Sequence, residues 1–315
     1  MKALYYERFG GPLLTGQLPD PMAHADGAVI DVRATGVCRS DWHGWQGHDP
    51  DIKNLPHVPG HELAGVVAEV GAAVQKWKVR DRVTVPFVAG CGKCPECVTG
   101  NQQVCDHQFQ PGFTAWGSFA QLVAIRYADE NLVRLPDGLD FVVAASLGCR
   151  VSTAYRAIVL QGRLEPGQWV AVHGCGGLGL SAIAIAVALG AQVIGVDIRQ
   201  PALQLAKSLG AAAVLDASVV DDIPQAIQEL TARGADLSLD ALGSRITCDN
   251  SIRSLRKRGR HVQVGLLAGA DASPSVPLEL AVSRELELVG SHGLQATHYP
   301  ELLHLVTSGK RVQSL

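Results

Sequence analysis

Four cysteines lie close together in the segment 91–105, and their spacing suits a metal ion. Cys91, Cys94, Cys97 and Cys105 are separated by two, two and seven residues. Four thiolates at such spacing are typical of a closed, tetrahedral zinc site, and Pro95 and the nearby glycines supply the turns that wind a loop around one ion. An iron–sulfur cluster is one alternative, because it also takes four cysteines. A pair of disulfides is the other, and it would need an oxidising compartment.

A glycine-rich segment after an apolar run has the pattern of a dinucleotide-binding turn. Residues 174–179 have the sequence GCGGLG. We expect Gly174 to make the tight turn, Gly176 to let the backbone approach a pyrophosphate, and Gly179 to let the next helix pack closely on the sheet. Gly177 completes the motif at the N-terminus of that helix, where free N–H groups would face the phosphates. An ordinary glycine-rich turn is the alternative.

An acidic residue after the following apolar run predicts which nucleotide is bound. Asp197 ends this run about 20 residues beyond the glycines, where a carboxylate can accept hydrogen bonds from the ribose hydroxyls of the adenosine. Its charge would repel the 2′-phosphate of NADP, so NAD is the expected cofactor. Arg199 could pair with that phosphate, and it keeps NADP as the less favoured alternative.

Three further candidate ligands are far apart in the sequence, and their surroundings group them. Cys38 lies in GVCRSDWHGWQG, His61 stands between Gly60 and Glu62, and Cys149 lies in ASLGCRVSTAYRA. Taken alone, a buried cysteine is usually a small core residue. These three segments, with the two motifs above, resemble the zinc-containing medium-chain alcohol dehydrogenase family over essentially the whole chain.

The resemblance implies a second zinc ion and assigns the residues around it. Cys38, His61 and Cys149 would hold this catalytic zinc and leave one position for water or substrate. Asp41 would hydrogen-bond the far side of the His61 imidazole and fix its orientation. Glu62, next to the site, would either adjust the coordination or serve as a structural carboxylate.

A proton path and further cofactor contacts also follow from the resemblance. Ser40 would take the proton of the alcohol and pass it, through the nicotinamide ribose, to His43 near solvent. Arg39 would contact the pyrophosphate. Thr153 and Leu178 would pack behind the nicotinamide ring.

The implied activity is the reversible oxidation of a primary or secondary alcohol to an aldehyde or ketone, with hydride transfer to NAD. One alternative is a polyol or sugar dehydrogenase, and another is a catalytically silent relative that binds zinc and nucleotide. Many polyol enzymes of the family replace the third cysteine with glutamate, so Cys149 favours the alcohol type. A zinc-free quinone reductase of this fold would lack the ligands.

The pattern of apolar residues differs between the first and second halves of the chain, and it predicts the elements that position these residues. Up to about residue 135, the sequence has short apolar runs separated by Gly and Pro, which is typical of a β-rich domain with long loops. These runs lie at 27–32, 64–70, 82–85 and 119–123. Beyond residue 147, helical patterns alternate with brief β-branched runs, which predicts a parallel sheet wrapped by helices. The fold class is α/β, and the resemblance makes it a GroES-like β-rich catalytic domain with a doubly wound Rossmann domain.

Individual strands and helices can be predicted in the part of the chain beyond residue 147. Strands are predicted at 169–173, 192–197, 212–215, 237–239 and 260–265. Helices are predicted at 178–189, 201–209, 223–232 and 246–258. Five basic residues between 253 and 260 are expected at a solvated helix end. The segment 275–289 has the character of an edge strand.

The domain boundaries follow from these patterns and from the resemblance. We expect 1–150 to form the catalytic domain with both zinc sites, 151–289 the NAD-binding domain, and 290–315 a return segment toward the first domain. Family chains usually have roughly 30 more residues than a chain ending at Leu315, so this segment is expected to be shortened. Relatives associate through the Rossmann domain, so a homodimer or homotetramer paired through 275–289 is expected.

Composition excludes several other classes of protein. With 315 residues, 47% hydrophobic and 18% charged, the chain suits two globular domains and not a disordered protein. The net charge of −3 gives no basic surplus to attract nucleic acid or an anionic membrane. The longest apolar stretch is shorter than the ~18 to 20 residues of a membrane span, and the N-terminus lacks an export signal. A cytoplasmic location and a small-molecule alcohol or carbonyl substrate are therefore expected.

Overall fold

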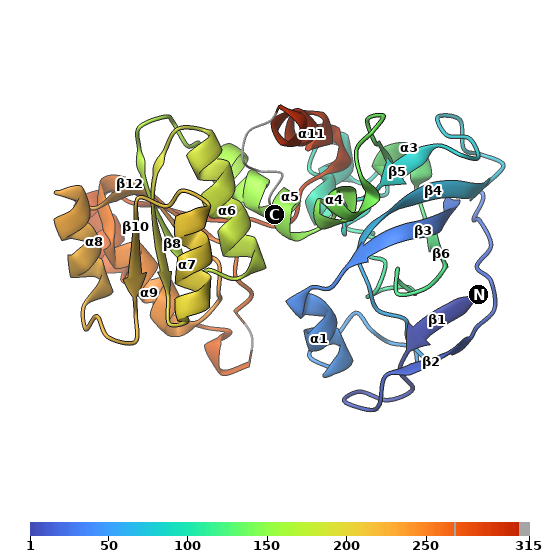
Figure 1. Cartoon of the computed structure of the whole chain (residues 1–315), viewed down its shortest axis with the longest axis horizontal. Helices are drawn as coiled ribbons and strands as arrows, with labels where there is room; N and C mark the ends of the chain where they lie inside the picture. The colour runs from blue at the N-terminus through green and yellow to red at the C-terminus, as the bar shows by residue number, and fades with distance from the viewer. Residues whose placement is uncertain (268, 309–315) are drawn as a thin grey trace. The chain divides into compact units, whose positions relative to one another are not determined.

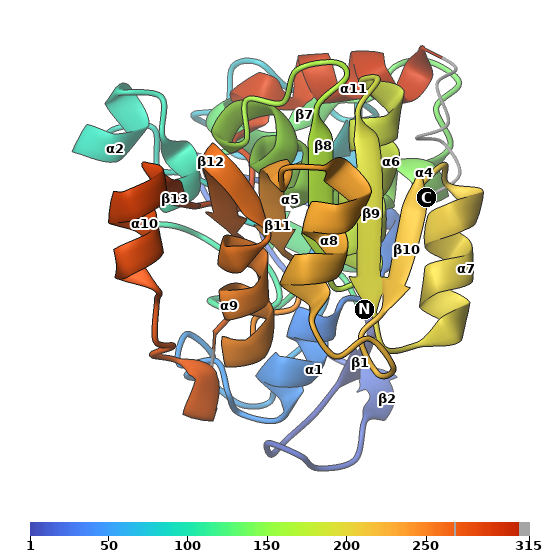
Figure 2. The ribbon, with the colours of Figure 1, turned by 90° about the vertical axis from the view of Figure 1, so that its left-hand side faces the viewer.

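The structure is a computed structural model that describes residues 1–267 and 269–308. The chain forms two compact units, which Figures 1 and 2 show from two directions. The first unit comprises Met1–Ser152 and Gly293–His304. The second comprises Thr153–His292 and the described residues from Leu305 to Ser308. The first unit is therefore discontinuous in sequence.

The first unit is rich in β-strands and contains short helices. Its strands are β1 (Lys2–Tyr5), β2 (Leu14–Gln17), β3 (Ala28–Gly36), β4 (Glu62–Val70), β5 (Arg82–Thr84), β6 (Leu122–Ile125) and β7 (Val133–Arg134). Its helices are α1 (Arg39–Trp45), α2 (Pro95–Val98), η1 (Gln102–Val104), α3 (Ala128–Asn131), α4 (Phe141–Ser146) and η4 (Ala296–His298). Two helices contribute residues to both units, namely α5 (Arg150–Tyr155) and α11 (Tyr299–Thr307).

An antiparallel five-stranded sheet forms the frame of the first unit, in the order β6-β3-β4-β5-β7. Ile30, Leu63 and Ile125 lie in its core with almost no exposed surface, so apolar burial stabilises this sheet. The predicted runs at 27–32, 64–70 and 82–85 are confirmed as β3, β4 and β5. The run at 119–123 begins too early, because residues 119–120 contact β1 and only then does β6 begin. Strands β1 and β2 were not predicted.

The second unit alternates strands and helices. Its strands are β8 (Trp169–His173), β9 (Gln192–Asp197), β10 (Ala213–Asp216), β11 (Ala235–Asp240), β12 (Leu255–Gln263) and β13 (Glu287–Gly290). Its helices are η2 (Arg156–Gln161), α6 (Gly177–Ala188), α7 (Gln200–Ser208), α8 (Ile223–Thr231), α9 (Arg245–Arg253), η3 (Gly269–Asp271) and α10 (Leu278–Arg284).

The strands of the second unit form one parallel sheet in the order β10-β9-β8-β11-β12-β13. Counted from β8, this is the order 3-2-1-4-5-6 of the Rossmann fold. Helices α6 and α7 cover one face, and α8 and α9 cover the other (Figure 1). The predicted doubly wound α/β class is therefore confirmed.

The prediction of a helix over 246–258 is wrong at its end. Helix α9 ends at Arg253, and β12 begins at Leu255. The basic residues that were expected at a solvated helix end instead lie mainly on β12, where two of them pair with carboxylates of the neighbouring strands. Arg256 contacts Asp236 on β11, and Arg260 contacts Glu287 on β13. The helical pattern was misleading because partners on other strands decide the conformation.

The prediction of an edge strand over 275–289 is only partly right. Strand β13 does lie at the edge of the sheet, but it is confined to Glu287–Gly290. Residues Leu278–Arg284 form helix α10 instead. Glu279 in the first turn and Arg284 in the last turn complement the dipole of this helix, which favours it over an extended chain.

The late segment Gly293–His304 belongs to the first unit. The Tyr299 hydroxyl donates a hydrogen bond to the Leu147 carbonyl oxygen over 2.9 Å, and the Gln295 amide donates to the Gly100 carbonyl oxygen over 2.9 Å. The Tyr299 side chain is completely buried. Among the described helices, none has the length and hydrophobicity to cross a bilayer.

Candidate functional site

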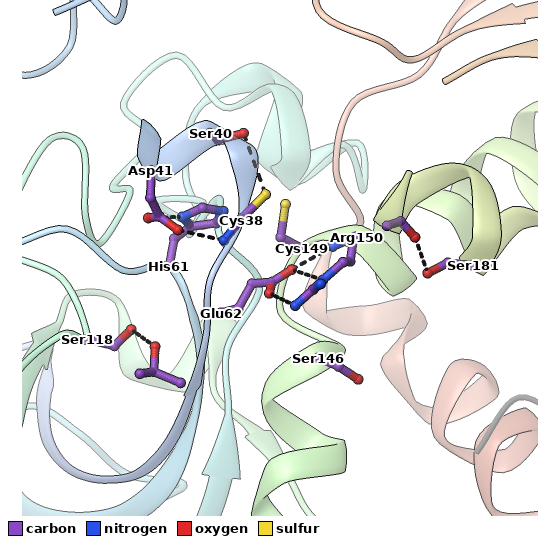
Figure 3. A network of polar contacts seen from close by, with 12 residues as sticks. Cys38, Ser40, Asp41, His61, Glu62, Ser118, Ser146, Cys149, Arg150 and Ser181 are labelled. Atoms are coloured by element: carbon purple, nitrogen blue, oxygen red, sulfur yellow. Dashed lines mark hydrogen bonds and ion pairs between the residues drawn. The ribbon is translucent and has the colours of Figure 1, made fainter. Parts of the chain in front are cut away.

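Cys38, His61 and Cys149 come together in the first unit (Figure 3). Their ligand atoms, two Sγ and one imidazole nitrogen, all lie within 4.8 Å of one another. The sheet explains part of this meeting. Gly36 at the end of β3 pairs with Glu62 at the start of β4, so the loop with Cys38 leaves the sheet beside His61. Cys149 follows α4 and lies immediately before α5.

Asp41 holds the backbone and the imidazole of this group in place. One of its carboxylate oxygens accepts hydrogen bonds from His61 Nδ1 over 2.9 Å and from the Gly60 N–H over 3.0 Å. The other accepts one from the Cys38 N–H over 2.8 Å. The second ring nitrogen of His61, Nε2, is buried and has no hydrogen-bond partner among the described residues. A bound zinc ion would satisfy this nitrogen, so the residues fit the metal.

The charges within this group favour a thiolate at Cys38. A hydrogen bond from Cys149 has the largest effect and, with His61, lowers the pKa of Cys38 to about 3. Burial opposes a charge on His61, but Asp41 and Cys38 together raise its pKa to about 10. The hydrogen bond to Cys38, together with burial, raises the pKa of Cys149. Zinc binds cysteine as thiolate and histidine as neutral imidazole, so binding would displace the protons that these groups share.

Glu62 is paired with a residue that sequence reasoning missed. The Glu62 side chain has no exposed surface, and both of its oxygens accept hydrogen bonds from Arg150. Burial raises the pKa of Glu62, although Arg150 acts in the opposite direction. A buried carboxylate needs a nearby cation. The one sequence feature that pointed to a partner for Glu62 was an arginine, Arg150, directly after the predicted zinc ligand Cys149. The sequence alone could not show that these two residues meet.

The predicted proton path begins on helix α1. The Ser40 hydroxyl lies 3.8 Å from Cys38 Sγ, next to the group of ligands. His43 lies one turn further along, and its Nδ1 is 3.1 Å from Nδ1 of His48. Sequence reasoning missed this histidine pair. Burial, with the charge of Arg39 and the neighbouring His48, lowers the pKa of His43.

Arg39 lies on the same helix and has an exposed side chain. Its guanidinium lies over the Trp42 ring, 4.9 Å from the ring centroid. The Trp42 ring also packs against the imidazoles of His43 and His48. Arg39 therefore presents a positive charge beside the two histidines, and its predicted contact with a pyrophosphate stays a prediction.

Cys91, Cys94, Cys97 and Cys105 form the second group, with sulfurs that also lie within 4.8 Å of one another. All four are buried free thiols, so this structure contradicts the alternative of disulfides. Tetrahedral coordination at a Zn–S distance of about 2.3 Å places sulfurs about 3.8 Å apart, and Cys94 Sγ lies 3.7 Å from Cys105 Sγ. A cluster of several irons would spread the cysteines further, because they are divided among different irons. The group therefore fits a single zinc ion.

In the second unit, the glycine-rich turn has the geometry that its sequence predicts. Gly174 adopts a φ of +96°, which a residue with a Cβ rarely adopts. A Cβ at Gly179 would collide with the Gly174 carbonyl oxygen, so close packing of α6 requires glycine there. A Cβ at Gly176 would have no described atom within 4 Å. Helix α6 begins at Gly177, so the N–H groups of its first turn, which have no partner within a helix, lie next in sequence to Gly176.

Asp197 ties the end of β9 to the glycine-rich turn. One carboxylate oxygen accepts a hydrogen bond from the Cys175 N–H over 2.8 Å, and the other accepts one from the Arg199 N–H over 2.9 Å. The Arg199 side chain also turns back to Asp197 over 3.4 Å. Arg199, the residue that could accommodate the 2′-phosphate of NADP, is therefore paired with Asp197, the residue whose charge would repel that phosphate.

The two residues expected behind the nicotinamide ring both lie in the second unit. The Thr153 hydroxyl is buried and has no hydrogen-bond partner among the described residues. Leu178 lies in the first turn of α6 and is half-buried. Their predicted packing against the nicotinamide stays a prediction.

Comparison with known proteins identifies both parts of the chain. Residues 24–137 match the family of the alcohol dehydrogenase GroES-like domain, and residues 177–308 match that of the zinc-binding dehydrogenase. An alcohol dehydrogenase of Geobacillus stearothermophilus is 34% identical over 311 residues, which cover 98% of this chain and 90% of that protein.

Solved structures give the same result. The alcohol dehydrogenase from Thermus sp. ATN1 has a TM-score of 0.90 at 30% identity, and the match covers 100% of this chain and 91% of that one. The D-arabinose dehydrogenase from Sulfolobus solfataricus has a TM-score of 0.84 at 28% identity, with coverage of 98% and 94%. Together with the zinc-ligand geometry and the nucleotide-binding fold, these matches show that the chain belongs to the zinc-dependent medium-chain alcohol dehydrogenase family.

Proposed function

We propose that this protein reversibly oxidises a primary or secondary alcohol to an aldehyde or ketone and transfers the hydride to NAD. The observation that carries the proposal is the environment of His61. Asp41 holds its Nδ1, while its buried Nε2 has no partner among the described residues and lies within 4.8 Å of two cysteine sulfurs. A Cys₂His set with one open position is the ligand set of a catalytic zinc.

The proposal assigns a role to the two groups of metal ligands and to Ser40 and His43. When bound, zinc supplies Lewis-acid chemistry and the nicotinamide accepts the hydride. Cys38, His61 and Cys149 hold the ion, and the four-cysteine group holds a second, structural zinc. Ser40 would accept the hydroxyl proton of the substrate, and His43, one turn further along α1, would release it to solvent.

The cofactor preference rests on the second unit. The backbone at Gly176 and the N-terminus of α6 bind the pyrophosphate. Asp197 binds the adenosine ribose and disfavours the 2′-phosphate of NADP. Arg199 is paired with Asp197, which supports NAD as the preferred nucleotide.

A sugar or polyol is the second candidate substrate class, because one structural relative is a D-arabinose dehydrogenase. The thiol of Cys149 in the ligand set favours a simple alcohol. A panel of primary alcohols, secondary alcohols, polyols and aldoses should be tested with zinc-loaded protein, following reduction of NAD and of NADP. Turnover of aldoses alone would replace the proposed substrate, and no turnover at all would indicate a catalytically silent relative.

We also propose that the protein forms a homodimer or homotetramer through β13. This strand lies at the edge of the six-stranded sheet, and an edge strand can pair with the same strand of a second copy. Light scattering on the purified protein gives the assembly mass, and a proline at Leu288 should lower that mass if β13 is the contact. A cytoplasmic location stays a prediction.

A further inference from the structure

The ion pair between Glu62 and Arg150 connects two segments that carry zinc ligands. Glu62 directly follows His61, and Arg150 directly follows Cys149. The Arg150 backbone N–H and Nε donate to one Glu62 oxygen over 3.1 and 3.0 Å, and Nη2 donates to the other over 2.6 Å (Figure 3). These bonds join residues that lie 88 positions apart in the chain.

The two segments pack against each other without side chains between them. A Cβ at Gly148 would lie 3.0 Å from Glu62 Cα and 3.3 Å from the His61 carbonyl oxygen. A Cβ at Gly36 would collide with the Glu62 carboxylate and lie 3.0 Å from Arg150 Nη2. Glycine at both positions therefore lets the ion pair form at close range.

Other contacts hold the same turn from different directions. The Leu147 carbonyl oxygen accepts the Tyr299 hydroxyl, and the Gly148 carbonyl oxygen accepts the Phe87 N–H over 3.0 Å. Neither donor is next in sequence to a residue of the Cys₂His set, although the Phe87 ring lies edge-on to the His61 imidazole with ring centroids 6.2 Å apart. The bonds from Arg150 are different, because they end on the residue next to His61.

We propose that Arg150, acting through Glu62, is a positioning residue that fixes Cys149 relative to His61 and thereby slows the loss of zinc from the Cys₂His set. Ligands that are already in register lose less conformational freedom when the ion binds. Groups behind the ligands typically contribute about 10- to 100-fold to metal affinity. The proposal rests on the proposed function, because it requires that this set binds zinc.

A salt bridge that merely stabilises the first unit is the competing explanation, and the chain offers a matched control. Arg134 makes a similar two-pronged pair with the buried Asp81, over 2.9 and 3.0 Å. Neither residue adjoins a cysteine or histidine of the two metal groups. Loss of Arg134 should therefore lower stability without changing how either site holds its ion.

The test compares Arg150→Met with Arg134→Met in the full, zinc-loaded chain. Release of zinc into an excess of a chromogenic chelator is followed with time, and the four-cysteine site serves as an internal reference. A Cys149→Ser variant identifies the phase that belongs to the Cys₂His set. We expect Arg150→Met to accelerate that phase by about 10- to 100-fold and to leave the other phase unchanged. Arg134→Met should change neither phase.

Because Arg150→Met leaves a buried carboxylate without its cation, it could fail to fold. The double variant Glu62→Gln with Arg150→Met removes that charge as well, and it should show the same accelerated release. In protein substituted with cobalt(II), the visible spectrum of the Cys₂His site should change in either variant and stay unchanged in Arg134→Met.

The outcomes separate the positioning role from the proposed function. Two zinc ions per chain, with release unaffected by the loss of Arg150, would overturn the positioning role alone. Equal acceleration of both phases would also overturn it, since a general loss of stability acts on both sites. A wild-type chain that holds only the four-cysteine zinc would overturn the proposed function together with this inference.

Discussion

A carboxylate oxygen of Asp41 lies 2.9 Å from Nδ1 of His61, and this contact leaves Nε2 as the ring nitrogen that faces the two cysteine sulfurs. The same carboxylate receives the N–H groups of Cys38 and Gly60. One side chain therefore sets the orientation of one ligand and the backbone of another.

Replacing Asp41 with Ala should weaken zinc binding at the Cys₂His set by about 10- to 100-fold, the usual effect of losing a group behind a histidine ligand. Asp41→Asn retains a hydrogen-bond acceptor and should lose less. Zinc content after dialysis against graded chelator measures this, with the four-cysteine zinc as the reference. Unchanged retention in Asp41→Ala would show that packing alone orients His61.

The two metal groups should differ in what their loss does. Cys94→Ser breaks the four-cysteine site and should lower the melting temperature, because metal binding there contributes to folding. Cys149→Ser should abolish turnover with a smaller effect on melting. Calorimetry and a turnover assay on both variants check this division. Equal thermal destabilisation would contradict it.

Asp197→Ala should shift the ratio of kcat/KM for NAD over NADP by at least about tenfold toward NADP, which corresponds to ~1.4 kcal/mol. The reason is the loss of a ribose contact and of the charge that repels a 2′-phosphate. Asp216→Ala is the matched control, because it removes a carboxylate from the end of the adjacent strand β10. An unchanged ratio in Asp197→Ala would show that the ribose assignment is wrong.

Ser40→Ala should lower kcat for alcohol oxidation about a hundredfold or more, the usual scale for a proton-transfer group. His43→Gln should cost less, and imidazole buffers should partly restore its rate, because a base in solution can replace a terminal group but not an inner one. Near wild-type turnover in Ser40→Ala, with zinc and NAD still bound, would remove Ser40 from the mechanism.

The pH profile of kcat for alcohol oxidation adds a second test of the proton path. Burial, Arg39 and His48 lower the pKa of His43, so it stays neutral and able to accept a proton below the usual pH of about 6.5. The acid limb of kcat should lie below that value, and His48→Gln should move it upward.

Two buried histidines predict a loss of stability in acid. Burial lowers the pKa of His173 to about 3 and that of His261 to about 4 in the folded second unit. In the unfolded chain both take up protons below about pH 6.5. The unfolded state then binds more protons, so the free energy of unfolding should fall as the pH drops from 6.5 toward 4. Denaturant titrations across this range measure the slope, and His173→Gln should make it shallower. An unchanged slope in that variant would show that His173 is not a source of the acid sensitivity.

The sequence could predict features whose parts lie close together in the chain. The four cysteines fall within one loop, and the glycine-rich turn joins a strand to the next helix, so spacing alone indicates their geometry. The contact between Glu62 and Arg150 could not be predicted in this way, because it depends on how β4 and the turn before α5 pack in three dimensions. The pairing of His43 with His48 depends on the turn after α1, and two histidines five residues apart do not by themselves predict a contact. The strand at 255–258 was missed for a related reason, since a carboxylate on β11, that of Asp236, pairs with Arg256.

The division of the first unit into two pieces of sequence has a consequence for synthesis on the ribosome. Domains generally fold as units while the chain emerges. Met1–Ser152 emerges first, but the turn before Cys149 receives its bond from Tyr299 only after all of Thr153–His292 has been made. The nucleotide-binding sheet lies within that stretch and can form while the zinc-binding unit still waits for its last segment. A ribosome stalled shortly before Tyr299 would therefore carry a nearly complete Rossmann sheet. The turn before Cys149 would still lack its hydrogen bond from Tyr299.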